Sequence, residues 1–478
     1  MDEIYTVLPE ASLTALACVV LLVDVYRRPE STALTFWTAI FALLAVLLQL
    51  ALGFPGDPTF AFNGTFVRDP MAAVMKSFLM VVMLLSFFYA RDYLDRRNHT
   101  DGVFYILALF AGIGMMVLIS AHSLLTVYLG LELLSLSLYA MVAMDRDSSA
   151  ASEAAMKYFV LGALASGMLL YGMSMLYGVS GTLDLEMLSQ RTSGQGHNVL
   201  FVFGLVFVLI GIAFKLGVAP FHMWVPDVYQ GAPTPVTLFI GSAPKLAAFA
   251  MAIRVLAEGL GGLGSEWQDM LIILAILSMA IGNIVAIAQT NIKRMLAYST
   301  ISHMGFLLLG IIAANALGYA AGMFYVIVYA LMSTGAFAAI IILSEPGFDA
   351  DQLSDFSGLA RRSPWTAFIV LILMFSLAGV PPFAGFWAKW FVLKEVIGAG
   401  YPWLAAVAVF FSLIGAFYYL RVIKLVYFDD SESGVRQITA TEDARLVFSV
   451  NGLAVLALGL LPGTLMSVCL GAMLAAGG

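Results

Sequence analysis

The sequence has little charge and almost no cysteine. Only 11% of its 478 residues are Asp, Glu, Lys or Arg, whereas 62% are hydrophobic and the mean hydropathy is +0.96. A water-soluble domain of this length needs a polar shell that this composition cannot supply. The two cysteines, Cys18 and Cys469, lie far apart in apolar runs, which excludes a disulfide framework and a cysteine-ligated zinc or iron–sulfur centre. We therefore predict an all-α, polytopic membrane protein that binds no cofactor itself.

Apolar runs long enough to cross a bilayer as a helix, about 20 residues each, recur along the whole chain. We predict about fourteen transmembrane helices, at 7–27, 33–54, 70–91, 102–120, 122–143, 152–178, 198–231, 233–257, 267–288, 293–313, 316–344, 364–399, 401–427 and 443–472. Of the 23 Lys and Arg residues, 14 then fall on one side of the membrane, Lys293 and Arg294 included, and 4 on the other. Basic residues concentrate in cytoplasmic loops. We therefore predict that both termini are periplasmic.

Two of these helices, 198–231 and 364–399, are too long for a simple crossing and contain proline and glycine. Pro220 interrupts the first, and Pro381 and Pro382 interrupt the second. Proline removes a backbone donor, and the carbonyls left unpaired need side chains or water inside the bundle. Paired broken helices are typical of transport sites.

Each broken helix is the fourth in a group of five. The grouping predicts a first five-helix repeat at 102–257 and a second at 267–427. Because five is odd, the second repeat enters the membrane inverted. A three-helix region at 1–101 and a C-terminal loop with the last helix at 428–478 complete the predicted organisation.

Several ionisable residues lie in the middle of predicted helices, where a charge is costly and usually functional. The clearest cases are Glu132, Lys215, Lys245, His303 and Lys389. A cation at Lys215 is favoured by the unpaired carbonyls that end the first half of a broken helix, and Glu132 is its expected ion-pair partner. We predict a proton path from Lys215 through Lys245 and His303 to Lys389 by way of bound water, with Glu132 as an electrostatic switch.

Structural roles compete with these assignments. Glu132 and Lys215 can form a purely structural ion pair, His303 can be a packing group, and Lys389 can extend toward the membrane surface. Lys157 and His222 are candidates for proton uptake or gating. However, Lys157 can also extend to the surface, and His222 can simply cap exposed carbonyls. Lys76 lies near a helix end and is interpreted as a lysine that extends to the surface.

Longer motifs surround these residues. They include YLGLELLSLSLY from Tyr128, EAAMKYFVLGALAS from Glu153, FKLGVAPFHMWVPDVYQGAPTPV from Phe214, NIKRMLAYSTISHMG from Asn291 and GVPPFAGFWAK from Gly379. With these motifs the chain resembles, over essentially its whole length, the antiporter-like subunits of the bacterial proton-pumping NADH:quinone oxidoreductase, respiratory complex I. A lysine at 389 and DVYQGAP at 227–233 place the resemblance in the subunit N branch.

The resemblance implies a bacterial cytoplasmic (inner) membrane protein that couples quinone reduction to proton translocation. It also implies that FMN, iron–sulfur clusters and quinone belong to partner subunits, and that the partners include neighbouring antiporter-like subunits of complex I. A component of a multisubunit sodium/proton antiporter and a non-pumping structural scaffold are the alternatives. Sodium-dependent exchange without NADH would mark the first, and tolerance of neutral residues at Lys215, Lys245 and Lys389 would mark the second.

Overall fold

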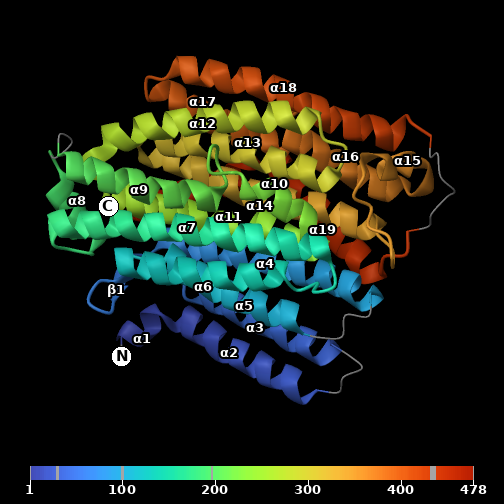
Figure 1. Ribbon diagram of the computed structural model, residues 1–478, viewed down its shortest axis with the longest axis horizontal. Helices are drawn as coiled ribbons and strands as arrows, with labels where there is room; N and C mark the ends of the chain where they lie inside the picture. The colour runs from blue at the N-terminus through green and yellow to red at the C-terminus, as the bar shows by residue number, and fades with distance from the viewer. Residues whose placement is uncertain (1, 28–31, 98–101, 195–197, 431–437, 477–478) are drawn as a thin grey trace.

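Long helices make up nearly all of the chain in the computed structural model, which describes residues 2–27, 32–97, 102–194, 198–430 and 438–476. Most of them lie side by side with their axes close to parallel (Figure 1). The elements in chain order are α1 Asp2–Thr6, α2 Leu8–Tyr26, α3 Ala33–Leu52, β1 Thr59–Ala61, β2 Phe66–Arg68, α4 Pro70–Arg96, α5 Val103–Ile119, α6 Leu124–Val142, α7 Ser149–Ser180, α8 Leu185–Thr192, α9 Val199–Leu216, α10 Trp224–Gly231, α11 Thr234–Ala252, η1 Ile253–Gly259, η2 Gly261–Leu263, α12 Gly264–Ile287, α13 Ile292–Ile312, α14 Ala316–Leu343, η3 Leu353–Phe356, α15 Leu359–Arg362, α16 Pro364–Ala378, α17 Ala384–Gly398, α18 Pro402–Tyr427, α19 Glu442–Leu460 and α20 Pro462–Ala476.

The number of crossings agrees with the prediction. In the described part of the chain, twelve helices are long and apolar enough to span a membrane. The shorter apolar helix α5 and the broken pair α16–α17 bring the total to fourteen when α9–α10 and α19–α20 each count as one crossing. A helix satisfies its own backbone hydrogen bonds, as a chain in a bilayer must. The all-α class is therefore confirmed.

Two local features differ from the prediction. The last predicted helix, 443–472, is two helices, because α19 ends at Leu460 and α20 begins at Pro462. The proline ring cannot continue the hydrogen-bond ladder of the preceding turn. A short antiparallel hairpin, β1–β2, pairs Thr59 with Arg68 in a connection where no strand was predicted. Strands of three residues are too short to give a periodic pattern in the sequence.

Two groups of five helices repeat one connectivity. The first consists of α5, α6, α7, α9–α10 and α11, and the second of α12, α13, α14, α16–α17 and α18. In each group the second helix begins at a capping residue that forms an isolated β-bridge with the segment after the third helix; the pairs are Ser123 with Asp184 and Asn291 with Gln352. Because each group crosses an odd number of times, the fold contains two inverted repeats. The exact division at 102–257 and 267–427 stays a prediction.

The first halves of the two broken helices end in the same way. Both α9 and α16 end at a glycine in the left-handed region, Gly217 with φ +79° and Gly379 with φ +85°. In each, the N–H groups of the glycine and of the valine after it donate to one carbonyl in the last helical turn. This is the usual capping pattern for a helix that ends in glycine. A cis peptide bond follows at Ala219–Pro220 and at Pro381–Pro382.

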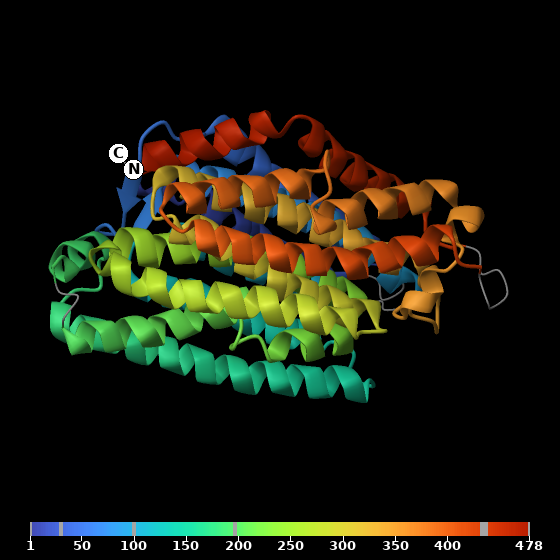
Figure 2. The same cartoon turned by 90° about the horizontal axis from the view of Figure 1, so that it is seen from above.

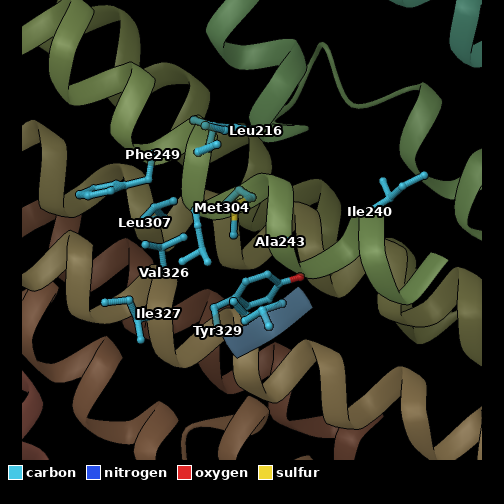
Figure 3. Packing of buried hydrophobic residues seen from close by; sticks show 14 of the residues in the cluster. Leu216, Ile240, Ala243, Phe249, Met304, Leu307, Val326, Ile327 and Tyr329 are labelled. Atoms are coloured by element: carbon cyan, nitrogen blue, oxygen red, sulfur yellow. The ribbon is translucent and has the colours of Figure 1, made fainter. Parts of the chain in front are cut away.

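The most buried helices are α11, α13 and α14, and every residue of α11 is buried. Figure 3 shows Ala243 of α11, Met304 of α13 and Tyr329 of α14 gathered in this central packing. Small residues allow the close approach of α13 and α14, because a Cβ on Gly310 would lie 2.8 Å from the Cα of Gly322. The charged residues of α11 and α13 are therefore held deep inside the protein.

The chain begins and ends at the same end of the bundle (Figures 1 and 2). The hairpin strand β1 and helix α8 lie at this end, and α15 lies at the opposite end (Figure 1). An even number of crossings requires this arrangement of the termini.

Candidate functional site

Lys215 lies at the end of α9, and its side chain is held by a hydroxyl. It is 5% exposed, and its Nζ donates a hydrogen bond of 2.8 Å to Ser135 Oγ on α6. A cavity of about 10 Å³ lies beside them, lined also by Tyr139 and Ser166. This volume is about the minimum for one water molecule, and the lining offers it several polar partners. Lys215 is therefore placed where a bound water can meet it.

Glu132 lies one turn from Ser135 on α6, but it does not contact Lys215 directly. No ion pair within 4 Å joins the two residues in the part of the chain that the structure describes. The Glu132 carboxylate acts on Lys215 through space, and its buried Oε1 has no hydrogen-bond partner. The predicted direct ion pair is thus wrong, because Ser135 takes the position next to the ammonium. The unpaired Glu132 oxygen can therefore form a new contact when neighbouring groups move.

Lys245 on α11 uses the carbonyls that the broken helix leaves unpaired. Its Nζ donates to Leu216 O at 2.9 Å and lies 3.4 Å from Lys215 O. The ammonium also lies 5.4 Å from the centre of the Trp224 ring, within the range of a cation–π interaction. The positive charge therefore sits at the C-terminal end of α9, where the helix dipole favours it. Lys215 and Lys245 are brought together at one helix end.

Lys389 on α17 repeats this arrangement in the second repeat. Its Nζ donates to Ala378 O, the last carbonyl of α16, at 2.9 Å, and to Ser412 Oγ on α18 at 2.9 Å. It lies 5.1 Å from the centre of the Phe306 ring. A lysine thus caps the first half of each broken helix, although the two lysines come from different positions in their repeats.

His303 on α13 is enclosed by tyrosines. Its Nδ1 is 2.7 Å from the Tyr325 hydroxyl and its Nε2 is 3.0 Å from the Tyr419 hydroxyl, which in turn bonds with Ser299. The Phe306 ring stacks on Tyr325, and the Lys389 ammonium lies over the same ring. Phe306 therefore contacts both Tyr325 and Lys389. We did not predict the tyrosines or Ser299, because single hydroxyls in apolar helices are common and usually structural. Together they make His303 part of a continuous hydrogen-bonded group.

A second small cavity lies beside His303, and Ser333 in its lining donates to Gly241 O, one turn before Lys245 on α11. It has a volume of about 10 Å³ and is lined by Ser299, Thr300, Tyr329 and Ser333 among others. The Tyr329 hydroxyl donates to Thr300 Oγ1 at 2.8 Å, and its ring centre is 5.1 Å from that of His303. No direct hydrogen bond joins Lys245 to His303 within the described residues. A water molecule in this cavity is thus the natural connection.

Two further candidates lie away from this path. The Lys157 side chain is 44% exposed on α7 and forms ion pairs of 2.8 Å with Glu153 and Asp227. His222 lies in the break after α9 and is half-buried, with a buried Nδ1 that has no hydrogen-bond partner. Their roles in proton uptake or gating stay predictions.

Lys76 on α4 does not extend to the surface, so that prediction is wrong. It is 2% exposed, forms a 2.5 Å ion pair with Glu10 on α2 and donates to Ser120 Oγ at 2.5 Å. The sequence pattern did not indicate Glu10 as its partner, because the two residues lie on different helices far apart in the chain. This ion pair lies outside the path described above.

No group of three or more His, Cys, Asp or Glu side chains within the described ranges is arranged to hold a metal ion.

Comparisons with known proteins agree with this geometry. A family model described as NADH:quinone oxidoreductase/Mrp antiporter, TM matches residues 121–415. NADH-quinone oxidoreductase subunit N from Thiobacillus denitrificans is 57% identical over 463 residues, which cover 97% of this chain and 96% of that protein. A chain in a structure of respiratory complex I from Thermus thermophilus with bound Aureothin is similar with a TM-score of 0.84 and 33% identity, covering 97% of this chain and 100% of that one. A chain of the Mrp complex from Dietzia sp. DQ12-45-1b has a TM-score of 0.83 at 21% identity, covering 98% and 97%, and this likeness shows the fold alone.

Proposed function

Because the chain belongs to the subunit N family of NADH-quinone oxidoreductase, we propose that its buried lysines, Glu132 and His303 carry the protons that this enzyme translocates. It is an antiporter-like, proton-translocating membrane subunit of a multisubunit complex, and a non-redox part of an oxidoreductase. We assign FMN, iron–sulfur clusters and quinone to partner subunits, as membership in the subunit N family implies. Neighbouring antiporter-like subunits are the expected membrane partners.

The observation that carries the proposal is the pair of lysines on broken helices. Lys245 caps α9 and Lys389 caps α16, each through one hydrogen bond to the last helical carbonyl. An amine that loses its proton there leaves a carbonyl that a water molecule can satisfy. A buried lysine in such a place can exist in both protonation states. This property separates a carrier from a lysine fixed in a structural ion pair.

The transfer is a sequence of proton exchanges. When the Lys215 ammonium gives up a proton, one N–H bond breaks there and one forms on the neutral amine of Lys245, directly or through water. Lys245 then passes the proton through the hydroxyl-lined cavity to His303. His303 then gives the proton through bound water to Lys389, whose ammonium contacts the Phe306 ring that stacks on Tyr325. One positive charge moves at each step, and no electron is transferred.

Glu132 is the proposed switch. Its carboxylate stabilises the ammonium of Lys215 through space. A signal from the redox partners that moves or neutralises this carboxylate weakens that attraction, and the proton leaves Lys215. The unpaired Glu132 oxygen supports this role, since no hydrogen bond holds it in place.

The predicted orientation has both termini in the periplasm of a bacterial inner membrane. It is supported by the excess of Lys and Arg in connections on the opposite side and by the position of both chain ends at one end of the bundle.

Proton translocation in reconstituted complex tests the proposal. The complete complex with Lys245→Ala is placed in liposomes, and protons moved per electron are measured during NADH oxidation. We expect a lower ratio, with the matched control Lys424→Ala unchanged because the Lys424 side chain is 68% exposed. An unchanged ratio in Lys245→Ala, Lys215→Ala and Lys389→Ala would favour the scaffold alternative. Sodium-dependent exchange without NADH would favour the antiporter alternative.

A further inference from the structure

Lys293 is a buried cation that the path above does not use. It lies in the first turn of α13, and although the sequence analysis counted it with the basic residues on the cytoplasmic side, it is only 4% exposed. Its Nζ donates to Ala232 O at 2.8 Å, and Ala232 is the residue at which α10 ends. Helix α10 is the second half of the first broken helix. Lys293 therefore caps the second half as Lys245 caps the first.

Polar groups connect Lys293 with the basic, cytoplasmic end of the bundle. Asp349, whose side chain is 41% exposed, and Asp351 are carboxylates close enough to act on Lys293, as is the Arg97 cation. The Tyr93 hydroxyl donates to Asp349 Oδ1 at 3.1 Å. Next to Tyr93, Thr234 has a buried hydroxyl without a hydrogen-bond partner. A proton from the aqueous phase thus meets acceptor groups along its way to Lys293.

Further polar groups lead inward from Lys293. Thr237 Oγ1 bonds with Tyr229 O at 2.9 Å and lies 3.4 Å from Ala232 O, the carbonyl that Lys293 uses. The buried Tyr229 hydroxyl makes no hydrogen bond within 3.5 Å to any described residue, but it lies close enough to Thr300 for a weaker interaction, and Tyr329 is also near. These two residues line the second small cavity, beside His303, and Tyr329 is visible in Figure 3. The hydroxyl of Tyr229 therefore lies between Lys293 and the central path.

Lys157 makes a weaker candidate for the same task. Its ammonium is shared between two carboxylates on a half-exposed helix face, and Asp227 is also bound to Arg294 at 2.8 Å. Two ion pairs keep a lysine protonated and in place. Lys293, by contrast, has one hydrogen bond to a neutral carbonyl.

From this geometry we propose that Lys293 is the proton acceptor on the cytoplasmic side and that it supplies the central path through Tyr229. The inference rests on the proposed function of the central lysines. A proton from a cytoplasmic hydronium ion forms an N–H bond on the neutral amine of Lys293 and leaves water behind. Lys293 then gives one proton to a water molecule beside Tyr229 and returns to the neutral amine. That water passes a proton to the Thr300–Tyr329 cavity, so no charge is left on the tyrosine.

Two substitutions separate this role from simple capping. Lys293→Met removes both the charge and the cap. Lys293→Arg keeps a charged donor that can reach Ala232 O, but an arginine cannot lose its proton in a protein. The complete complex carrying each variant is reconstituted in liposomes, and assembly, NADH-driven quinone reduction and protons moved per electron are measured. Lys245→Ala and Lys424→Met are measured beside them.

We expect Lys293→Arg to assemble, with a proton-to-electron ratio as low as that of Lys245→Ala, and Lys424→Met to keep the full ratio. A full ratio in Lys293→Arg would show that Lys293 only caps α10 and would overturn the inference. A full ratio in Lys293→Met would also overturn the inference. If Lys245→Ala is still defective in the same experiment, the proposed central path remains supported. If Lys245→Ala itself keeps the full ratio, the proposed function fails rather than its uptake route.

Tyr229→Phe gives an independent test, because it removes one hydroxyl and little volume. Its hydroxyl has no close hydrogen-bond partner to lose, so assembly should be normal. We expect a lower proton-to-electron ratio. An unchanged ratio would contradict the inward route through Tyr229.

Discussion

Single hydroxyl groups decide which atoms the buried charges contact. Lys215 bonds with Ser135, Lys389 with Ser412 and His303 with two tyrosines. Each hydroxyl both donates and accepts, so it can hold a charged or a neutral partner. A carboxylate in the same place would fix one protonation state. This difference makes the hydroxyls suitable neighbours for groups that exchange protons.

Ser135→Ala should impair Lys215. The change removes the acceptor at 2.8 Å and leaves a buried donor unsatisfied, which costs about 1–3 kcal/mol. We expect NADH-driven proton translocation to slow by roughly tenfold, since about 1.4 kcal/mol corresponds to that factor. Ser137→Ala is the control, because Ser137 bonds only with the backbone of its own helix, at Leu133 O. Equal pumping by the two variants would remove Ser135 from the path.

Tyr419→Phe distinguishes a proton-carrying His303 from a packing group. The variant keeps the ring but loses the hydroxyl that lies 3.0 Å from His303 Nε2 and also contacts Ser299. We expect fewer protons moved per electron with normal assembly. Tyr105→Phe, whose buried hydroxyl on α5 has no hydrogen-bond partner among the described residues, should keep the wild-type ratio. If neither variant changes the ratio, His303 serves packing alone.

At the scale of elements, the breaks in α9–α10 and α16–α17 position the site. Each break exposes carbonyls at a helix C-terminus inside the protein, and a lysine from another segment reaches them. The glycines that end α9 and α16 allow the left-handed turn that points these carbonyls at the lysines. The location of the charges therefore follows from where the helices stop.

Gly379→Ala should displace Lys389 from the carbonyl at the second helix break. Its φ of +85° is unfavourable for alanine, and the added Cβ would lie 2.9 Å from Lys389 Cδ and 3.1 Å from Nζ. Lys389 must then move from Ala378 O, and we expect proton translocation to be lost in reconstituted complex. Gly400→Ala is the matched control, since φ is +92° but no atom lies within 4 Å of the new Cβ. Similar losses in both variants would assign the effect to backbone strain rather than to Lys389.

At the scale of the whole molecule, a buried ion pair joins two of the N-terminal helices, and a hydrogen bond from the same lysine reaches the first repeat. Lys76 on α4 contacts Glu10 on α2 and Ser120 at the end of α5, and both charged side chains are at most 8% exposed. Breaking a buried ion pair leaves an uncompensated charge, whereas replacing both partners costs less. The pair thus fixes how α2 sits on the rest of the bundle.

Lys76→Met should lower the stability of the subunit more than Lys76→Met combined with Glu10→Gln. We expect a loss of about 3–5 kcal/mol for the single variant because the Glu10 carboxylate remains buried and unpaired. Thermal inactivation of the purified complex and the retention of this subunit during purification measure the effect. If the double variant is as unstable as the single one, packing rather than charge explains the loss.

The sequence by itself determined the class and the number of crossings, and it indicated the candidate residues of the proposed path. Low charge and apolar runs of bilayer length require helices, because a helix satisfies its own backbone in lipid. The rule that buried charges are costly singled out Glu132, Lys215, Lys245, His303 and Lys389 without any coordinates. Proline and glycine located both helix breaks to within a few residues.

Only the tertiary structure decided which groups meet. It bonded Lys215 to Ser135 rather than to Glu132, gathered tyrosines around His303, bonded the buried Lys293 to the end of α10 and paired Lys76 with Glu10. Such contacts join side chains on different helices, and the rotation of each helix about its axis selects them. A nearly uniform apolar sequence carries little information on that rotation. In the folded chain, the packing of small residues and the position of each helix break determine how each helix is rotated.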